Sequence, residues 1–436
     1  MPREHRPLKT TPYWWEDAPV QPLPEVPLEQ KVDVAIVGAG YTGLSAALTL
    51  VRAGRSVAVF DRQHPGEGAS SRNGGITSGN IRLDHATLLR KFGNDRTIAI
   101  EAEGKLARQH LYDLIAGEGI DCDLQPVGRF TGTLGAEDYD SNARSAEHLH
   151  RTLGIESFAV PRSEQRDYIG SDYFHGGTVR MDISGLHPAK FIAELLRLVQ
   201  AAGITVYADT AVEKIEQDAS GYSVTTARGK LSARQVMICT NGYTDRMDPW
   251  LRRRIVPVRS RMIATAVLPA DLMAELTPKR MMMCDTRTLG FYFRPSPDGR
   301  RILFGGRDGT NLDDPTKPVA YLRENMLSIF PQLDQTPITH TWFGHVAMQR
   351  DMIPRIFERD GMIYATGFCG SGVVWAPWIA RKAAQKLLGN ANEAPSAFDF
   401  RAPAPVPFYN GKPWFMPFFM AQYRMRDRIK MRRAGR

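Results

Sequence analysis

Six residues near the start of the chain have the types and spacing of a phosphate-binding loop. They run from Gly38 to Gly43 and read GAGYTG, a G-x-G-x-x-G pattern. Gly38 permits a tight turn, Gly40 lets the backbone approach a pyrophosphate, and Gly43 lets a helix pack closely on a strand. Asp61 follows Gly38 by 23 residues, close to the spacing of about 20 at which a carboxylate accepts hydrogen bonds from a ribose. The pattern therefore predicts a dinucleotide site.

The loop is flanked by the elements that such a site requires. Residues 32–37 (VDVAIV) are apolar and β-branched, 44–52 have helical character, and 56–60 form a second apolar run that closes on Asp61. This β-α-β unit directs the N-terminus of a helix, with its partial positive charge, at the phosphates. Asp61 argues against a 2′-phosphorylated cofactor, whereas the adjacent Arg62 either accepts such a phosphate or is a solvated surface charge.

Two further glycine-rich loops separate FAD from NAD. Residues 68–75 (GASSRNGG) form a loop too long for a simple turn, and its N–H groups suit a ligand that extends beyond the first pyrophosphate site. Downstream, 363–366 read as a strand, 367–372 (GFCGSG) as a loop and 373–388 as a helix broken early by Pro377. The N-terminus of that helix would face the pyrimidine edge of a flavin, where negative charge develops on reduction. An NAD site needs no such helix, so the sequence predicts FAD.

Length and composition restrict the class of protein. A chain of 436 residues exceeds the roughly 250 to 300 residues at which single cores stop growing, which favours two connected domains. The formal charge is +9, but residues 422–436 alone carry +6 of it, so the body is too weakly basic for a nucleic-acid track. The four cysteines are scattered, with no Cys-x-x-Cys pair and no zinc-like spacing, which predicts a reducing compartment and no metal site. Without a secretory signal or an apolar run of about 18 residues, we expect a cytoplasmic enzyme.

Motifs along nearly the whole chain resemble those of the D-amino acid oxidase and glycine/sarcosine oxidase superfamily of FAD proteins. Within it, the resemblance is greatest to the γ-glutamylputrescine oxidoreductase-like branch. The stretches that carry it are YWW at 13–15, GASSRNGG at 68–75, IDCDLQPVGR at 120–129, CTNGYTD at 239–245, YFRPSPDGRRILFGGR at 292–307, WFGHVAMQRDMIP at 342–354 and GFCGSGV at 367–373.

The resemblance implies an α/β fold of two domains. One is an FAD-binding, Rossmann-like domain of the glutathione reductase type, and the other is an α+β substrate domain whose antiparallel sheet covers the flavin. The implied divisions are an N-terminal extension at 1–30, a discontinuous FAD-binding domain at 31–90, 176–254 and 342–395, a substrate-binding domain at 91–175 and 255–341, and a C-terminal aromatic and basic extension at 396–436.

The resemblance also implies which residues contact the cofactor. The backbone of Val212 would meet the adenine, 240–242 would close over the ADP half, and 73–76 would lie along the flavin ring. The full implied set is Gly38, Gly40, Tyr41, Thr42, Gly43, Asp61, Arg62, Ala69, Ser70, Ser71, Arg72, Asn73, Gly74, Gly75, Ile76, Val212, Thr240, Asn241, Gly242, Gly344, Asp351, Gly367, Cys369, Gly370, Ser371, Gly372 and Val373.

The chain departs from the family pattern close to the flavin. Related sequences often have serine and histidine where this chain has Cys369 and Ser371, and threonine in place of Gln349. These departures concern the substrate rather than the cofactor. The branch that tethers FAD covalently has a cysteine before the aspartate that corresponds to Asp351, and no cysteine stands there. We therefore expect non-covalent FAD, with Cys369 as a small structural residue.

The expected reaction is oxidation of a C–N bond in a small amine or amino acid. The flavin accepts hydride at N5 from the carbon beside a neutral amine, and the imine is then hydrolysed. Tyr292, His345 and Arg350 are the candidate pocket residues. Arg350 suits a substrate carboxylate or is a surface arginine paired with Asp351 or solvent; His345 is a base, a polar contact or a structural histidine. No catalytic base follows from the sequence.

The electron acceptor and the partners have several interpretations. The sarcosine oxidase branch has an oxygen-activating lysine on the strand corresponding to 301–305, and this chain has none. That favours a dehydrogenase using a quinone or electron carrier over an oxidase. The alternative is that Arg301 or Arg307 supplies the positive charge in place of the lysine.

Residues 413–420 (PWFMPFFM), followed by the basic segment, suggest an aromatic patch packed on the domain beside a solvated basic helix. A membrane-surface element or a subunit contact is the alternative. The competing functions are a flavoprotein subunit of an electron-transfer complex and a hydroxyl-oxidising dehydrogenase.

Overall fold

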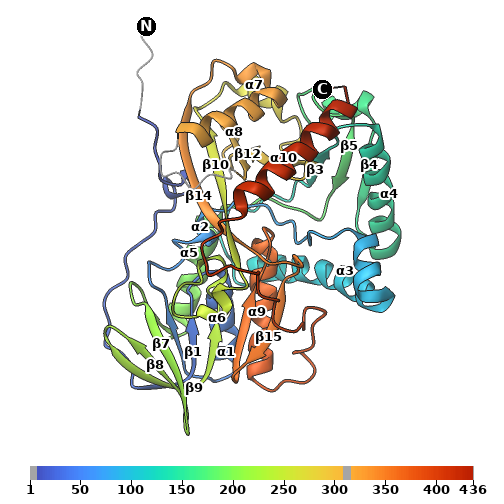
Figure 1. Ribbon diagram of the computed structural model, residues 1–436. Helices are drawn as coiled ribbons and strands as arrows, with labels where there is room; N and C mark the ends of the chain where they lie inside the picture. The colour runs from blue at the N-terminus through green and yellow to red at the C-terminus, as the bar shows by residue number, and fades with distance from the viewer. Residues whose placement is uncertain (1–6, 308–315, 436) are drawn as a thin grey trace.

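Two β-sheets organise the chain, one below the other in Figure 1, in a computed structural model that describes residues 7–307 and 316–435. The first sheet has the order β15-β16-β9-β1-β2-β6, with the β7–β8 hairpin extending from β9. Its strands are β1 (Lys31–Val37), β2 (Val57–Phe60), β6 (Thr205–Tyr207), β7 (Val212–Asp218), β8 (Gly221–Thr226), β9 (Gly229–Ile238), β15 (Arg355–Arg359) and β16 (Met362–Thr366). Strands β16, β9, β1, β2 and β6 run parallel.

Helices cover the parallel part of this sheet because its strands are apolar on both faces. They are α1 (Tyr41–Arg52), α5 (Pro188–Ala201) and α9 (Gly372–Leu387), and α1 packs against both α5 and α9. The helix expected at 373–388 is not broken at Pro377. It continues through this residue, because buried side chains on both sides of Pro377 fix the helix in the core.

The second sheet has the order β14-β10-β13-β12-β11-β3-β5-β4. It is antiparallel except where β3 and β11 pair in parallel. Its strands are β3 (Arg129–Gly132), β4 (Ser157–Val160), β5 (Gly177–Arg180), β10 (Val256–Thr265), β11 (Met282–Asp285), β12 (Tyr292–Pro295), β13 (Ile302–Gly306) and β14 (Ile338–Met348).

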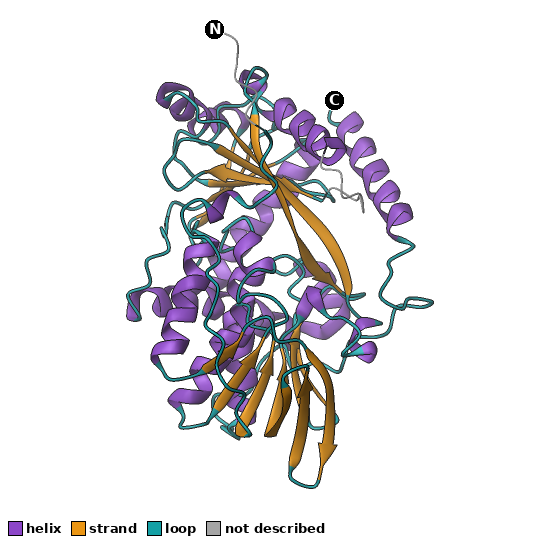
Figure 2. Ribbon diagram, turned by 90° about the vertical axis from the view of Figure 1, so that its left-hand side faces the viewer, coloured by secondary structure: helices purple, strands orange, loops and turns teal. Residues whose placement is uncertain are grey.

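Helices lie beside both sheets, and they differ in length (Figure 2). The longer ones are α3 (His85–Gly117), which packs against α9 of the first domain, and α4 (Ala136–Leu153), α7 (Ala270–Leu276), α8 (Thr316–Ile329) and α10 (Met416–Arg433). The short ones are α2 (Ala69–Arg72), α6 (Pro249–Arg252) and the 3-10 turns Tyr13–Trp15, Arg162–Asp167, Asn241–Tyr243 and Pro331–Leu333.

Two strands belong to a different sheet from the one that the expected domain ranges imply. Strand β5 lies within the expected range 176–254 of the first domain but pairs with β3 and β4 in the second sheet. Strand β14 enters the expected range 342–395 yet stays paired with β10 as far as Met348. The glycine-rich motifs gave no signal for where these pairings end.

The C-terminal segment is arranged differently from the favoured expectation. The basic helix α10 is docked on the second domain, where the buried Asp427 accepts hydrogen bonds from the backbone N–H groups of Thr288 (2.7 Å) and Leu289 (3.0 Å). Of the aromatic residues before and at its start, Phe415 packs against the buried Tyr409, whereas Phe408 is 93% and Phe418 70% exposed. Most basic side chains of α10 are exposed, as expected for a solvated basic helix. Within the described residues, no helix has the length and apolar character needed to span a membrane.

Candidate active site

A cleft of about 1220 Å³ runs along the carboxyl ends of the parallel strands. This volume includes space that is open to solvent. Its lining joins segments distant in sequence, and the predicted residues among it are Gly38, Gly40, Tyr41, Thr42, Asp61, Arg62, Ala69, Ser70, Asn73, Val212, Thr240, Asn241, His345, Cys369, Gly370, Gly372 and Val373.

The N-terminus of α1 opens into this cleft as the glycine pattern predicts. Gly40 is the N-cap and has no side chain to cap the helix. The N–H of Tyr41 donates to the Ser70 Oγ (3.0 Å), and the N–H groups that follow it remain for a ligand. A Cβ at Gly43 would lie 1.8 Å from the carbonyl oxygen of Gly38. Gly38 itself has a φ of +107°, a conformation that a residue with a Cβ rarely adopts. The loop can therefore hold a pyrophosphate against backbone.

Asp61, the residue predicted to bind the ribose, lines the same cleft. Its Oδ2 accepts a hydrogen bond from the Ala39 N–H (2.8 Å) and its Oδ1 from the Gln63 N–H (3.0 Å). Burial raises the pKa of this carboxyl, and the two backbone N–H groups oppose the rise. Each oxygen keeps a further lone pair for a ribose hydroxyl. Arg62 forms an exposed ion pair with Asp245 (3.0 Å) at the rim.

A second helix N-terminus meets the same cleft from the other end. Helix α9 begins at Gly372, and no side chain caps it. The Asn241 Oδ1 accepts hydrogen bonds from the Gly367 N–H (3.0 Å) and the Thr366 hydroxyl (3.2 Å), which fixes the loop before α9. Cys369 is buried with a φ of +50°. The two glycine loops thus lie at one cavity, as expected for FAD.

Aromatic residues of the N-terminal segment hold the 68–75 loop. The Trp14 indole N–H donates to the carbonyl of Asn73 (2.9 Å) and that of Trp15 to the Ser71 hydroxyl (3.0 Å). From β14, the Trp342 indole N–H donates to the carbonyl of Arg72 (2.9 Å). Ser71 is consequently buried beneath the loop and lines neither this cleft nor its neighbour.

An adjoining cavity of about 830 Å³ lies against the second sheet. It shares part of its wall with the first cleft, including Asn73, His345 and Gly370. Tyr292 lines it, with its hydroxyl 3.0 Å from the Ser260 Oγ. The remaining predicted residues in its lining are Ala69, Arg72, Gly74, Ile76, Gly344 and Val373. A substrate in this cavity would lie directly beside a ligand in the first cleft.

Four arginines line this second cavity, namely Arg72, Arg82, Arg129 and Arg307, and two of them lie next to α9. A Cβ at Gly370 would lie 3.3 Å from Nη2 of Arg307 and 3.7 Å from Nη2 of Arg82. Burial lowers the pKa of Arg307 to about 9, and repulsion from Arg82 adds to this. Among the described lining residues there is no carboxylate, and the Nε of both Arg129 and Arg307 has no hydrogen-bond partner. The cavity is therefore suited to an anionic group.

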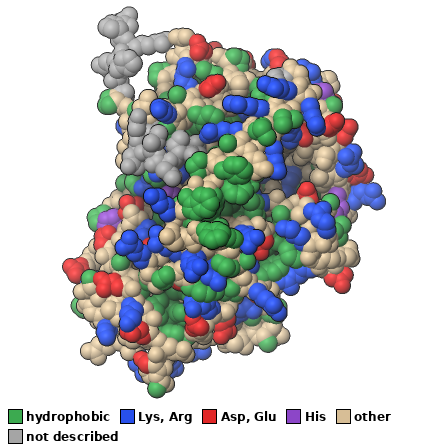
Figure 3. Space-filling view, viewed as in Figure 1, with side chains coloured by type: hydrophobic (Ala, Val, Ile, Leu, Met, Phe, Trp, Pro, Cys, Tyr) green, Lys and Arg blue, Asp and Glu red, His purple; other side chains and the backbone are tan. Residues whose placement is uncertain are grey.

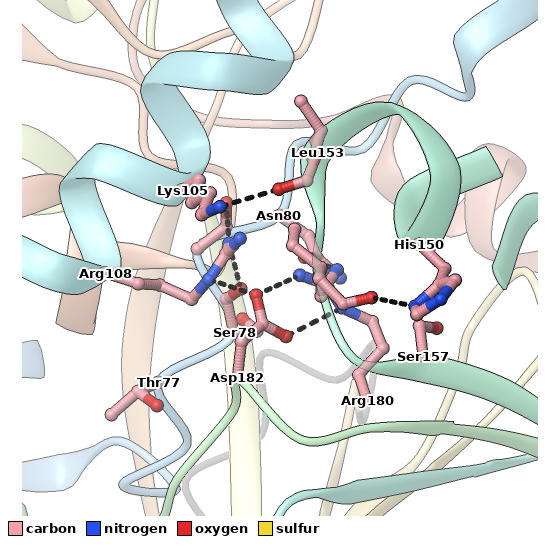
Figure 4. A network of polar contacts seen from close by, with 12 residues as sticks. Thr77, Ser78, Asn80, Lys105, Arg108, His150, Leu153, Ser157, Arg180 and Asp182 are labelled. Atoms are coloured by element: carbon pink, nitrogen blue, oxygen red, sulfur yellow. Dashed lines mark hydrogen bonds and ion pairs between the residues drawn. The ribbon is translucent and has the colours of Figure 1, made fainter. Parts of the chain in front are cut away.

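A polar network lies behind the arginine-lined wall (Figure 4). Asp182 forms ion pairs with Arg108 (2.6 Å) and Arg180 (2.7 Å). Burial would raise the pKa of Asp182, but the two guanidinium groups hold it below its usual value. Arg108 also donates to the carbonyl of Ser78 (3.2 Å), a lining residue of the second cavity. The network therefore anchors this wall from behind.

Several predicted residues lie outside both linings. Arg350 is exposed in the turn after β14, so it does not provide the expected carboxylate contact. Asp351 lies four residues before Arg355 and forms an ion pair with it. Both follow the end of the strand, where the chain turns to the surface. The others pack or support the loops without lining a cavity, namely Gly43, Ser71, Gly75, Gly242, Gly367 and Ser371.

Sequence reasoning missed Arg82, Arg129 and Arg307 as a group. Arg307 ends the RILFGGR stretch and Arg129 ends IDCDLQPVGR, so both stood in quoted motifs. Arg82 follows the 68–75 loop without any pattern of its own. Only their convergence in space distinguishes them from surface arginines.

Comparison with known proteins identifies the family to which this chain belongs. Residues 33–386 match the model of the DAO family, described as FAD dependent oxidoreductase. The chain belongs to this family. A relative named "Probable oxidoreductase OrdL" from Rhizobium meliloti is 29% identical over 400 residues, which cover 90% of this chain and 92% of the relative. One named "Gamma-glutamylputrescine oxidoreductase" from Escherichia coli is 29% identical over 403 residues, covering 91% and 93%.

Solved structures agree on the fold. Glycine oxidase from Geobacillus kaustophilus superimposes with a TM-score of 0.72 and 20% identity, covering 85% of this chain and 97% of that one. The chain is therefore an FAD-dependent oxidoreductase, and FAD is its cofactor. The residues fit the group, because two helix N-termini without a side-chain cap and the half-buried Asp61 line one cleft.

Proposed function

We propose that this enzyme oxidises the C–N bond of a small amine that carries a carboxylate group. The observation that carries the proposal is the pair of arginines beside the loop that begins α9, the exposed Arg82 and the buried Arg307, both of which line the second cavity. A bidentate guanidinium is the preferred partner of a carboxylate. The relatives named gamma-glutamylputrescine oxidoreductase and glycine oxidase support an amine or amino-acid substrate.

The arginines would also select the protonation state of the substrate. Bound FAD supplies the hydride acceptor, and the carbon that loses hydride must carry a neutral amine. Burial and nearby positive charges both disfavour an ammonium group. Arg82 and Arg307 therefore bind the carboxylate and, from the same place, lower the pKa of the amine.

The remaining polar groups of the cavity position the substrate. The Tyr292 hydroxyl and the Ser260 Oγ, 3.0 Å apart, can hydrogen-bond a substrate from the second sheet. His345 lies at the wall common to both cavities, and the Tyr243 hydroxyl accepts a hydrogen bond from its backbone N–H (3.2 Å). We propose positioning roles for Tyr292 and His345, and assign no residue as the base.

An anaerobic substrate screen tests this proposal. The holoenzyme is mixed with amino acids, N-methyl amino acids, acylated polyamines that bear a carboxylate and the matching amines that lack one, while flavin absorbance is followed. We expect bleaching by carboxylate-bearing amines and little by the matched amines. Reduction by alcohols alone would instead identify a hydroxyl-oxidising dehydrogenase.

We propose a dehydrogenase rather than an oxidase. Strand β13 (Ile302–Gly306) carries no lysine. Arg301 does not substitute for it in the cavity, because it donates to the carbonyl of Thr265 (2.7 Å) and lines neither cavity. Stopped-flow mixing of the reduced enzyme with oxygen or a soluble quinone separates the two, since a dehydrogenase would react faster with the quinone.

The exposed aromatic residues favour a second function beside the first, docking at an anionic membrane that holds the acceptor. Trp414 is 63% exposed, and hydrophobic side chains gather near the start of α10 with Lys and Arg around them (Figure 3). Aromatic rings beside cations are typical of interfacial binding. Co-sedimentation with vesicles containing phosphatidylserine, compared with phosphatidylcholine alone, tests it. Equal partition of the protein with both kinds of vesicle would contradict the docking.

A further inference from the structure

Two imidazoles and one carboxylate meet away from the flavin site, where α3 faces α4. The Nδ1 of His85 lies 2.7 Å from Oε1 of Glu101, and the Nε2 of His148 lies 3.3 Å from its Oε2. All three ligand atoms lie within 4.8 Å of one another. The two rings are 4.3 Å apart between centroids. Three potential metal ligands thus converge on one point.

The kink in α3 makes this convergence possible. His85 precedes Glu101 by 16 residues, and a continuous helix of that length would separate them by about 24 Å. The helix is interrupted at Gly93, which has a φ of 76° and a ψ of 176°. The segment before Gly93 therefore folds back and brings His85 over Glu101. Glycine suits this conformation because it lacks a Cβ.

Thr152 orients His148, and the nearby cations bind other groups, so the Glu101 carboxylate interacts with the two histidines. The Nδ1 of His148 lies 3.3 Å from the Thr152 Oγ1, which leaves its Nε2 directed at the shared point. Such an outer contact is typical of a metal-binding histidine. The Lys105 ammonium, one turn beyond Glu101, donates instead to the carbonyl of Leu153 (2.6 Å; Figure 4). Arg151 pairs with Glu147 (3.5 Å).

We propose that His85, Glu101 and His148 bind one divalent transition-metal ion of the Zn²⁺ class. Imidazole nitrogen and carboxylate oxygen are both ligands for such ions, and three protein ligands leave at least one position for water. The Glu101 side chain is only 13% exposed, so its charge is poorly solvated and a cation would compensate it. Spacing along the chain gives no zinc motif, because the ligands come from two helices and both sides of a kink.

Metal titration of the chelator-treated holoenzyme tests the proposal. Zn²⁺ binding is measured by calorimetry, and Co²⁺ by its visible absorption bands outside the flavin region, after subtraction of the flavin spectrum. We expect one ion per chain in the wild type. His85→Ala and His148→Ala should each weaken binding at least tenfold and abolish the rise in melting temperature that Zn²⁺ produces in the wild type.

His150→Ala is the matched control. His150 lies on α4 as His148 does, but its Nδ1 lies 3.3 Å from the carbonyl oxygen of Ile155, so its removal should leave metal affinity unchanged. The proposal is overturned if the wild type binds neither ion more tightly than about 1 mM, or if all three histidine variants bind as the wild type does. The cluster would then be a hydrogen-bonded triad alone. Flavin content serves as a separate check that each variant is folded.

Discussion

At the scale of single residues, Arg82 and Arg307 decide what the second cavity can bind. The two guanidinium groups lie side by side and repel each other, and the buried one of Arg307 also loses hydration, which is costly unless an anion compensates it. The Arg82 Nε donates to the carbonyl of Cys369 (3.1 Å), so this arginine is fixed beside the α9 loop. We therefore expect the pair to select an anionic group and to fix where that group binds.

Replacing Arg307 should selectively impair carboxylate binding. A hydrogen bond to a charged group contributes about 1.5–3 kcal/mol, so we expect Arg307→Gln to weaken a small carboxylate ligand roughly tenfold to a hundredfold. The measurement is the perturbation of the flavin spectrum on titration with the ligand. Arg350→Gln, which changes an exposed arginine outside both linings, is the control and should bind normally. Equal weakening in both variants would contradict the assignment.

Gly43 should be irreplaceable for FAD binding. A Cβ there would lie 1.8 Å from the Gly38 carbonyl oxygen, so Gly43→Ala must displace the phosphate loop or α1. We expect the variant to purify largely without flavin. In Gly117→Ala the new Cβ meets nothing within 4 Å, and flavin content should equal that of the wild type. A fully yellow Gly43→Ala protein would show that the loop does not hold the pyrophosphate.

At the scale of elements, the loop between β11 and β12 is where α10 attaches. Asp427 of α10 accepts from two backbone N–H groups of this loop, and Asp285 at the end of β11 accepts from the Phe291 N–H (3.0 Å) across it. Burial raises the pKa of Asp285 to about 6, although Arg287 opposes the rise. Protonation of Asp285 thus affects the junction between this loop and α10.

Stability should fall as the pH rises through the pKa of Asp285. Because the folded-state pKa of about 6 exceeds the unfolded value of about 3.9, the folded form retains the proton more strongly, and this stabilisation is lost between roughly pH 4 and 6. Asp285→Asn has no proton to lose there, so its melting temperature should rise relative to the wild type across this interval. The exposed Asp271→Asn serves as the control. A constant difference across the interval would refute the prediction.

At the scale of the whole molecule, the first cleft lies where the two sheets meet. The first cleft is lined by the parallel sheet and its helices, yet His345, Val346 and Ala347 of the lining come from β14 of the second sheet. A ligand in the cleft therefore contacts both layers. Removal of the ligand should therefore weaken the association of the two sheets, and not only the packing of one element.

Denaturation should release FAD, because we expect it to be bound non-covalently. Adding FAD back to the apoprotein should stabilise both layers. Acid precipitation is expected to leave the flavin in the supernatant, because no cysteine precedes Asp351. FAD at about 100 times its Kd would add about 2.7 kcal/mol to the free energy of unfolding, seen as a higher melting temperature of the reconstituted apoprotein. Yellow colour that stays in the washed pellet would instead indicate a covalent bond.

The sequence by itself determined the cofactor and the parts that bind it. The Gly38–Gly43 pattern, Asp61 and the loop before α9 are local signals, because each depends on the backbone conformation that a few neighbouring residues allow. A strand, a turn and a helix N-terminus follow from such residues wherever the chain then goes. The family and the fold that these motifs predicted were confirmed by the comparisons with known proteins.

Only the tertiary structure decided which side chains share a cavity. Arg82, Arg129 and Arg307 lie far apart in sequence, and Arg350 resembles them in every local respect, yet strand ends and sheet pairing bring the first three to one cavity and leave Arg350 outside it. The physical reason is that long-range packing sets the direction of a side chain, and no local pattern encodes it. The same holds for His85 and His148, which meet only because α3 bends at Gly93 and α4 packs beside it.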